Sequence, residues 1–189
     1  SGNGVFLYTG MGLVSHVFDE AALSRLPGII AIGHNRYSTA GSSRLANAQP
    51  ITVDGPSGKL ALAHNGNIIN AVPLRQELEE KGYRFATTSD SEVIANLIVA
   101  SPGTSLEEKI SHTMHRLQGA YSLVMCTRDT LIGIRDPLGF RPLCLGELNG
   151  SYVLASETCA LDLIDATYVR DIKPGEIVII DGNGLRSLF

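Results

Sequence analysis

Residues 61–70 (Ala-Leu-Ala-His-Asn-Gly-Asn-Ile-Ile-Asn) place an asparagine and a glycine directly after a short apolar run. The carboxamide of Asn65 and the backbone N–H of Gly66 can point at one developing negative charge, because glycine lets another group approach the backbone closely. The pair therefore suits an oxyanion site. Asn-Gly is also the strongest short signal for a hairpin turn, so the pattern alone leaves a plain turn as the alternative.

Charged and hydroxyl side chains flank this pair in the sequence. Arg36, Tyr37 and Thr39 lie upstream, and Asp90 lies downstream at the start of a predicted helix. The guanidinium of Arg36 can bind a carboxylate through two parallel hydrogen bonds, and Asp90 can accept hydrogen bonds from an ammonium group. Each also has a structural explanation: an ion pair for Arg36, and the positive end of a helix dipole for Asp90.

Six stretches resemble, in consistent order, the glutamine amidotransferase domain (class II, N-terminal nucleophile) of the amidophosphoribosyltransferase family. They are residues 33–41, 61–70, 87–92, 135–143, 155–160 and 173–176. The resemblance covers nearly the whole chain and implies the four-layer α-β-β-α sandwich of N-terminal-nucleophile hydrolases. Residues 138–143 together with Tyr37 fit this family better than the glucosamine-phosphate synthase or asparagine synthetase relatives.

The resemblance implies that the flanking residues bind one substrate, L-glutamine. In the family, the residues matching Arg36 and Asp90 hold its α-carboxylate and α-ammonium groups, and those matching Asn65 and Gly66 form the oxyanion hole. A zwitterion with a terminal amide needs this combination of a cation, an anion and oxyanion donors. The remaining predicted pocket residues are Tyr37 and Thr39. We expect His64, beside the oxyanion pair, to be a satisfied structural histidine and not a general base.

The family nucleophile is an N-terminal cysteine whose own α-amino group acts as the base. This sequence opens with Ser-Gly-Asn-Gly, and none of its three cysteines stands at a matching position. Ser1 is chemically able to act as an N-terminal nucleophile, but the alignment places it in a turn. We therefore expect residues 1–189 to be one glutamine amidotransferase domain that is N-terminally incomplete and inactive on its own.

In the family, the released ammonia passes to a phosphoribosyltransferase domain, where it displaces pyrophosphate from phosphoribosyl pyrophosphate. The product is 5-phosphoribosylamine, in de novo purine synthesis. That partner domain binds Mg²⁺ and is expected outside residues 1–189, so we expect no cofactor here. The family assembles as homo-oligomers. The alternatives are a non-catalytic glutamine-binding or scaffold module, and the domain of another class II amidotransferase.

Composition indicates a globular domain without a nucleic-acid or membrane partner. Hydrophobic residues make up 44% of the 189 positions, charged residues make up 18%, and the formal net charge is −4. There is no lysine- or arginine-rich run that could follow a phosphate backbone. No apolar run approaches the roughly 18 residues of a membrane span, so we expect a cytoplasmic protein. Cys126 and Cys144 lie in apolar runs, which is typical of buried, reduced thiols.

Hydrophobic periodicity predicts an α+β domain with antiparallel sheets. We expect helices over residues 18–26 and 70–81, and two more that begin with Ser-x-x-Glu capping boxes at Ser89 and Ser105. Residues 64–67 are predicted as a turn and residues 42–56 as a surface loop. We interpret the charges of residues 135–142 as a structural ion pair in a turn. The predicted strands are residues 5–13, 29–32, 60–63, 121–127, 130–135, 143–148, 151–156 and 176–180.

Overall fold

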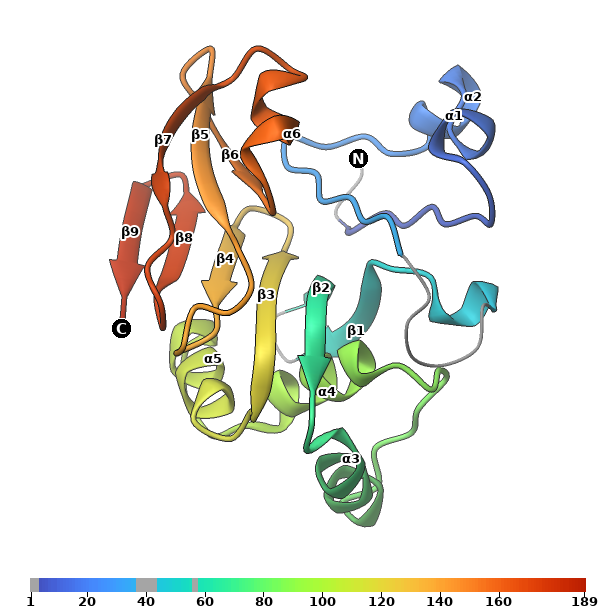
Figure 1. The fold of residues 1–189 in the computed structure, drawn as a ribbon. Coiled ribbons are helices and arrows are strands. Elements are labelled where there is room, and N and C mark those ends of the chain that lie inside the picture. The colour runs from blue at the N-terminus through green and yellow to red at the C-terminus, as the bar shows by residue number, and fades with distance from the viewer. Residues whose placement is uncertain (1–3, 37–43, 56–57) are drawn as a thin grey trace.

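Two antiparallel sheets form the centre of the molecule (Figure 1). The structure is a computed structural model that describes residues 4–36, 44–55 and 58–189. The large sheet has the strand order β1-β2-β3-β4-β8-β9 and the small sheet the order β6-β5-β7. Their bounds are β1 Ile51–Gly55, β2 Gly58–Ile68, β3 Gly119–Cys126, β4 Leu131–Arg135, β5 Cys144–Leu148, β6 Ser151–Ala155, β7 Thr167–Asp171, β8 Ile177–Asp181 and β9 Gly184–Leu188.

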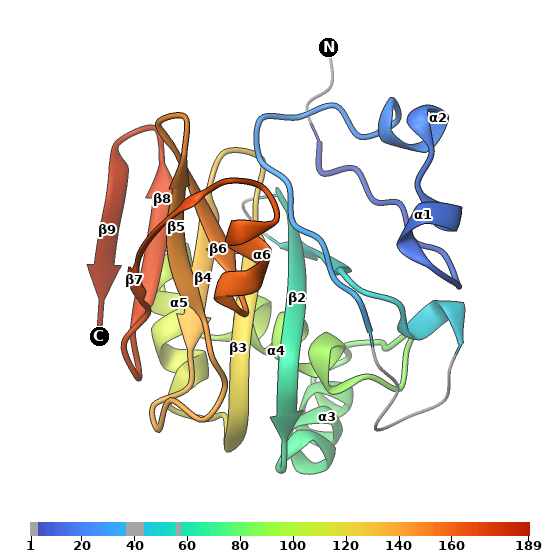
Figure 2. The same ribbon diagram turned by 45° about the horizontal axis from the view of Figure 1, so that its top comes forward.

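Helices cover the outer faces of both sheets (Figures 1 and 2). One side of the large sheet carries α3 Ala71–Glu80, α4 Asp90–Ala100 and α5 Leu106–Met114, with α4 packed against α3, α5, β1 and β2. The small sheet lies on the opposite side and is covered by α6 Thr158–Asp162, which contacts β6 and β7. This arrangement confirms the predicted four-layer α+β fold.

Alternate residues along the central strands enter two different cores. On β3, Leu123 and Met125 belong to the cluster under the helices, whereas Val124 packs against the cluster between the sheets. On β8, Ile177 belongs to the first cluster and Val178 to the second. Successive side chains of a strand point to opposite faces, so a strand between two layers needs apolar residues at every position. Both faces of β3 and β8 are therefore covered by apolar side chains.

The predicted turn at residues 64–67 is wrong, because β2 continues as a strand to Ile68. Asn65 pairs with Ser122 of β3, and Gly66 pairs with Tyr121. A hairpin at Asn-Gly requires the chain that follows to pair back at once, and here the partner strand comes more than fifty residues later. Gly66 instead allows close strand contact. A Cβ atom at this position would lie 2.1 Å from the carbonyl oxygen of Ala120.

The N-terminal third departs most from the predictions. Residues 5–13 and 29–32 are not strands, because no neighbouring strand in the described part of the chain pairs with them. The predicted helix over 18–26 is reduced to one turn, α2 Glu20–Leu23, after the similarly short α1 Val14–Val17. Within the predicted loop over 42–56, residues 51–55 form β1 by pairing with β2. Four further elements were not predicted: β7, β9, α6 and a 3₁₀ helix, η1 Leu45–Asn47.

Only one of the two predicted capping boxes forms. At α5, Ser105 accepts from the backbone of Glu108, and the Glu108 side chain returns the bond. At α4, Ser89 caps the helix by accepting from Ser91 N–H. The Glu92 carboxylate there turns away from the cap and accepts instead from the backbone N–H groups of residues 86 and 87, at 2.8 and 2.7 Å.

A buried carboxylate joins the two sheets. Glu176, 1% exposed, precedes β8 and accepts two hydrogen bonds from Arg170 of the small sheet, at 2.7 and 2.8 Å. Its carboxylate also accepts from the hydroxyl of Ser187 on β9 and from Lys173 N–H. Burial alone raises the pKa of Glu176, but these hydrogen bonds outweigh burial and lower that pKa to about 2.

Gly66→Ala should destabilise the protein much more than Gly58→Ala. Both glycines lie on β2 at positive φ, where a Cβ atom costs about 1–2 kcal/mol. Only Gly66 lacks space for that atom, because a Cβ at Gly58 would meet nothing within 4 Å. Urea denaturation of both variants measures the difference. Equal losses of unfolding free energy would contradict the close approach of β2 and β3.

Glu176→Gln should lower the free energy of unfolding at pH 7 by about 2 kcal/mol, because it removes a buried carboxylate that pairs with the charged Arg170 guanidinium. The folded-state pKa lies below the ordinary 4.5, so the stabilisation is present above pH 4.5 and is lost as the pH falls toward 2. The difference in unfolding free energy between wild type and variant should therefore disappear as the pH falls from 4.5 toward 2. Glu147→Gln, at an exposed position on β5, is the control and should show no such gap.

Candidate functional site

Four of the six predicted site residues line one cavity of about 710 Å³. Asn65 and Gly66 come from β2, Asp90 comes from the first residue of α4, and Arg36 comes from the segment before residue 37. The other two, Tyr37 and Thr39, lie outside the described residues. Positions from three separate parts of the sequence thus converge on one cavity. Further lining residues, which the sequence did not single out, are Gln49, Arg75, Arg141 and Ser156.

Asp90 presents an ionised carboxylate to this cavity. Its Oδ2 accepts from Ile68 N–H at 3.2 Å, and its Oδ1 lies 3.5 Å from Nδ1 of His64. Burial alone raises the pKa of Asp90, but hydrogen bonds from His64, Ile68 and Ser91 outweigh burial, so the pKa lies below its ordinary value. The side chain remains 24% exposed. Asp90 can therefore accept hydrogen bonds from a ligand cation.

His64, which also lines this cavity, contacts Asp90 through its side chain. Its side chain is 1% exposed, and Nδ1 lies 3.4 Å from the hydroxyl of Ser91 as well as near Asp90. The backbone N–H of His64 donates to the Gln49 side chain at 2.7 Å. Nε2 has no hydrogen-bond partner in the described part of the chain. The prediction of a satisfied structural histidine therefore holds for one ring nitrogen and is wrong for the other.

The segment before α4 is fixed by side chains from elsewhere in the fold. Asn47, 2% exposed, accepts from Thr88 N–H and donates to the Thr88 hydroxyl, both at 3.1 Å. Arg75 of α3 donates to the carbonyl oxygen of Thr87 at 2.5 Å and lies over the ring of Phe85. Together with the Glu92 carboxylate, these contacts determine where α4 begins. The position of Asp90 follows from them.

His34, a neutral histidine, lies near Arg36 in the lining of the cavity. Burial, and secondarily the positive charges of His64 and Arg36, lower the pKa of His34 from 6.5 to about 4. His34 is therefore uncharged at neutral pH. Arg36, half-buried on the same segment, supplies the positive charge at this end of the cavity.

Arg141 contacts the predicted oxyanion donor directly. Its Nη2 donates to Oδ1 of Asn65 at 2.5 Å, across 76 positions of sequence. The predicted ion pair within residues 135–142 is wrong. Asp136 accepts from backbone N–H groups of the turn, and Arg135 donates to three backbone carbonyl oxygens. The sequence marked Arg141 only as a charged residue after a rigid turn, within the family-like stretch 135–143, and not as a site residue.

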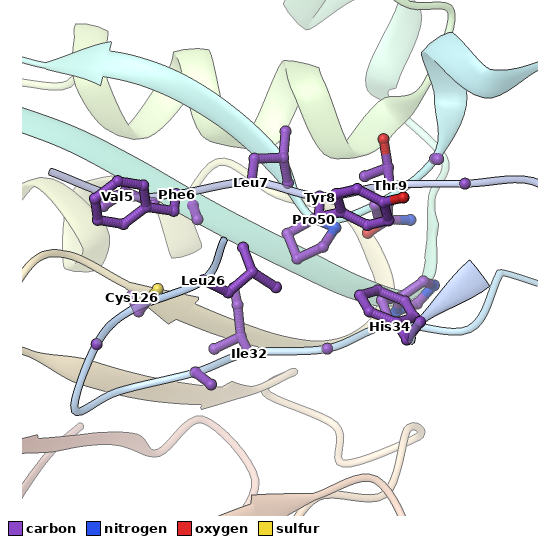
Figure 3. Close-up of a pocket in the computed structure, with 18 of the residues that line it drawn as sticks. Val5, Phe6, Leu7, Tyr8, Thr9, Leu26, Ile32, His34, Pro50 and Cys126 are labelled. Carbon is purple, nitrogen blue, oxygen red and sulfur yellow. The ribbon is translucent and has the colours of Figure 1, made fainter. Parts of the chain in front are cut away.

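A second cavity, of about 540 Å³, is mostly apolar and does not resemble a site for a zwitterion. Figure 3 shows the extended segment from Val5 to Thr9 on one side of it and the segment around Ile32 on the other. Cys126 lies at this cavity, and burial raises the pKa of its thiol. Cys144 is also buried, and Cys159 is exposed. The described residues that line the 710 Å³ cavity include no cysteine.

Residues 4–36, 44–55 and 58–189 contain no group of three or more His, Cys, Asp or Glu side chains arranged to hold a metal ion. Among the helices that the structure describes, none is both long enough and apolar enough to cross a membrane.

The chain is similar in sequence to curated amidophosphoribosyltransferases. A curated amidophosphoribosyltransferase from Glycine max is 54% identical over 182 residues, which cover 95% of this chain and 32% of that protein. A second, from Synechococcus elongatus, is 53% identical over 192 residues, covering 98% of this chain and 39% of that protein. The chain thus spans about a third of the length of these curated relatives.

A solved structure has the same fold. It is the glutamine phosphoribosylpyrophosphate amidotransferase from B. subtilis complexed with ADP and GMP. It superposes with a TM-score of 0.87 at 44% identity, over 94% of this chain and 38% of that one. Residues 34–163, which include Asn65, Asp90 and Arg141, match the family described as "Glutamine amidotransferase domain". This chain belongs to that family.

Proposed function

We propose that this chain is the glutamine-hydrolysing domain of an amidophosphoribosyltransferase, which supplies ammonia for the synthesis of 5-phosphoribosylamine from phosphoribosyl pyrophosphate. One observation carries the proposal: Arg36, Asp90 and the Asn65–Gly66 pair line a single cavity. The similarity to amidophosphoribosyltransferases over nearly the whole chain supports phosphoribosyl pyrophosphate as the compound that reacts with the ammonia.

The cavity wall complements each polar part of L-glutamine. Arg36 offers parallel donors to the α-carboxylate, and ionised Asp90 accepts from the α-ammonium group. Asn65 and Gly66 lie at the position for the side-chain amide, where negative charge develops when a nucleophile attacks the carbonyl carbon. The cavity's volume of about 710 Å³ is ample for one small amino acid.

In the proposed reaction, a nucleophile attacks the amide carbon of glutamine and the carbonyl oxygen becomes an oxyanion. The Asn65 side chain and Gly66 N–H stabilise that charge, the C–N bond breaks, and ammonia leaves with a proton supplied at its nitrogen. Water then releases glutamate. We assign the attacking group to an N-terminal cysteine, as the family resemblance implies, since burial keeps Cys126 and Cys144 protonated.

The phosphoribosyltransferase step belongs to the whole protein. We propose that this chain works joined to a phosphoribosyltransferase domain, that it assembles as a homo-oligomer in the cytoplasm, and that Mg²⁺ acts only in the other domain. A non-catalytic glutamine-binding module remains the second candidate, and glutamate release by the full-length protein distinguishes the two. Release of glutamate supports the enzyme, and saturable glutamine binding without release supports the binding module.

Asp90→Asn should raise the KM for L-glutamine by about 10- to 100-fold, the cost of losing a hydrogen bond to a charged group. The test uses the full-length protein that carries this chain and compares glutamine with glutaramate, which is glutamine without its α-ammonium group. The variant should weaken the use of glutamine and leave that of glutaramate unchanged.

Asp54→Asn is the matched control, since Asp54 is an exposed carboxylate on β1 that pairs with Lys59 outside the cavity. An equal loss for glutamine and glutaramate would mean that Asp90 does not bind the ammonium group, and would refute its assignment.

A further inference from the structure

The Asn65 carboxamide has two ends with opposite hydrogen-bonding character. Its nitrogen donates and its oxygen accepts, so only one of its two orientations places a donor at the oxyanion. A rotation of 180° about the last side-chain bond would present the oxygen lone pairs to a negative charge. The site therefore needs a contact that selects one orientation, and the main chain of β2 does not provide it.

Arg141 has the property required for this selection. A guanidinium carries five N–H donors and no acceptor, so it can bond only the oxygen end of the carboxamide. Nη2 of Arg141 donates to Oδ1 of Asn65 at 2.5 Å. Because the carboxamide is planar, the Nδ2 end is then directed away from Arg141. The charged donor also polarises the amide and strengthens its N–H groups as donors.

The backbone of Arg141 is fixed at both of its polar groups. Its N–H donates to Oδ2 of Asp136, a fully buried carboxylate, at 3.0 Å. Its carbonyl oxygen accepts from Nε of Arg135 at 2.8 Å. Asp136 N–H in turn donates to the carbonyl oxygen of Tyr121 on β3, the strand that pairs with β2. The turn and Asn65 are therefore attached to the same pair of strands.

We propose that Arg141 is a positioning residue that orients the Asn65 carboxamide so that Nδ2 faces the oxyanion during glutamine hydrolysis. This inference rests on the proposed glutaminase function. It predicts that Arg141 acts on catalysis through Asn65, so its loss should reduce kcat while the KM for glutamine stays nearly unchanged.

Steady-state glutaminase assays on the full-length protein test this. Arg141→Ala should lower kcat by about 10- to 100-fold, less than the loss of a whole oxyanion donor. In an Asn65→Ala background the same substitution should cause no further loss. Millimolar guanidinium should restore part of the activity of Arg141→Ala, because position 141 is exposed to solvent, and should not restore that of Asn65→Ala.

Two substitutions at position 141 distinguish an orienting role toward the Asn65 carboxamide from a simple contact with it. Lysine has donors only, as arginine does, so Arg141→Lys should retain much of kcat. A glutamine side chain at position 141 has both a donor and an acceptor, so it can bond Asn65 in either orientation of the carboxamide. Arg141→Gln should therefore behave like the alanine variant. Arg84→Ala, which removes an exposed arginine outside the cavity, is the control for lost charge.

Each outcome decides between the alternatives. A normal kcat in Arg141→Ala, an additive loss with Asn65→Ala, or a change confined to KM would overturn the inference. A raised KM with normal kcat would make Arg141 a glutamine contact instead. If Asn65→Ala is fully active, Asn65 is not an oxyanion donor and the inference fails, although the protein is still a glutaminase. If the wild-type protein releases no glutamate, the proposed function itself fails. Thermal unfolding of each variant confirms that the comparison is made on folded protein.

Discussion

The close pairing of β2 with β3 is the constraint on which the site depends. At Gly66 the two backbones approach so closely that a Cβ atom would overlap Ala120 and Tyr121. This contact allows β2 to continue past the apolar residues of the core, so that its last residues reach the cavity. Successive side chains of a strand point to opposite faces, so β2 contributes residues to the cavity from both of its faces. His64 points toward α4, and Asn65 points toward the turn after β4.

Backbone N–H groups hold three carboxylates, one in the cavity wall and two in the segments that support it. Asp90 accepts from Ile68 N–H, Glu92 from two N–H groups before α4, and Asp136 from three N–H groups of its turn. A carboxylate bonded in this way is held in one position, because the donors cannot move without unfolding a main-chain segment. Much of the cavity's geometry is therefore set by main-chain segments.

Sequence patterns predicted the longer helices α3, α4 and α5 and the central strands well, because those elements follow a local rule. Ser105 and Glu108 form their capping box from neighbouring residues, and the apolar residues of β3 and β8 follow from burial on both faces. The misses have non-local causes. Residues 64–67 have strong turn propensity, yet pairing with a distant strand keeps them extended. Residues 5–13 and 29–32 have strand-like composition but no paired neighbour in the described structure.

The site residues also divide into those that the sequence identifies and those that only the folded structure reveals. The chemical types of Arg36, Asn65, Gly66 and Asp90, together with the family resemblance, identified them, and the structure places all four around one cavity. The support behind them was not visible in the sequence. Arg141 lies 76 residues from Asn65, and the charges around it read as an ion pair because sequence cannot show that Asp136 and Arg135 bond the main chain. An oxyanion donor is effective only if its orientation is fixed before charge develops. Residues that fix that orientation are therefore found by tracing each hydrogen bond outward from the site.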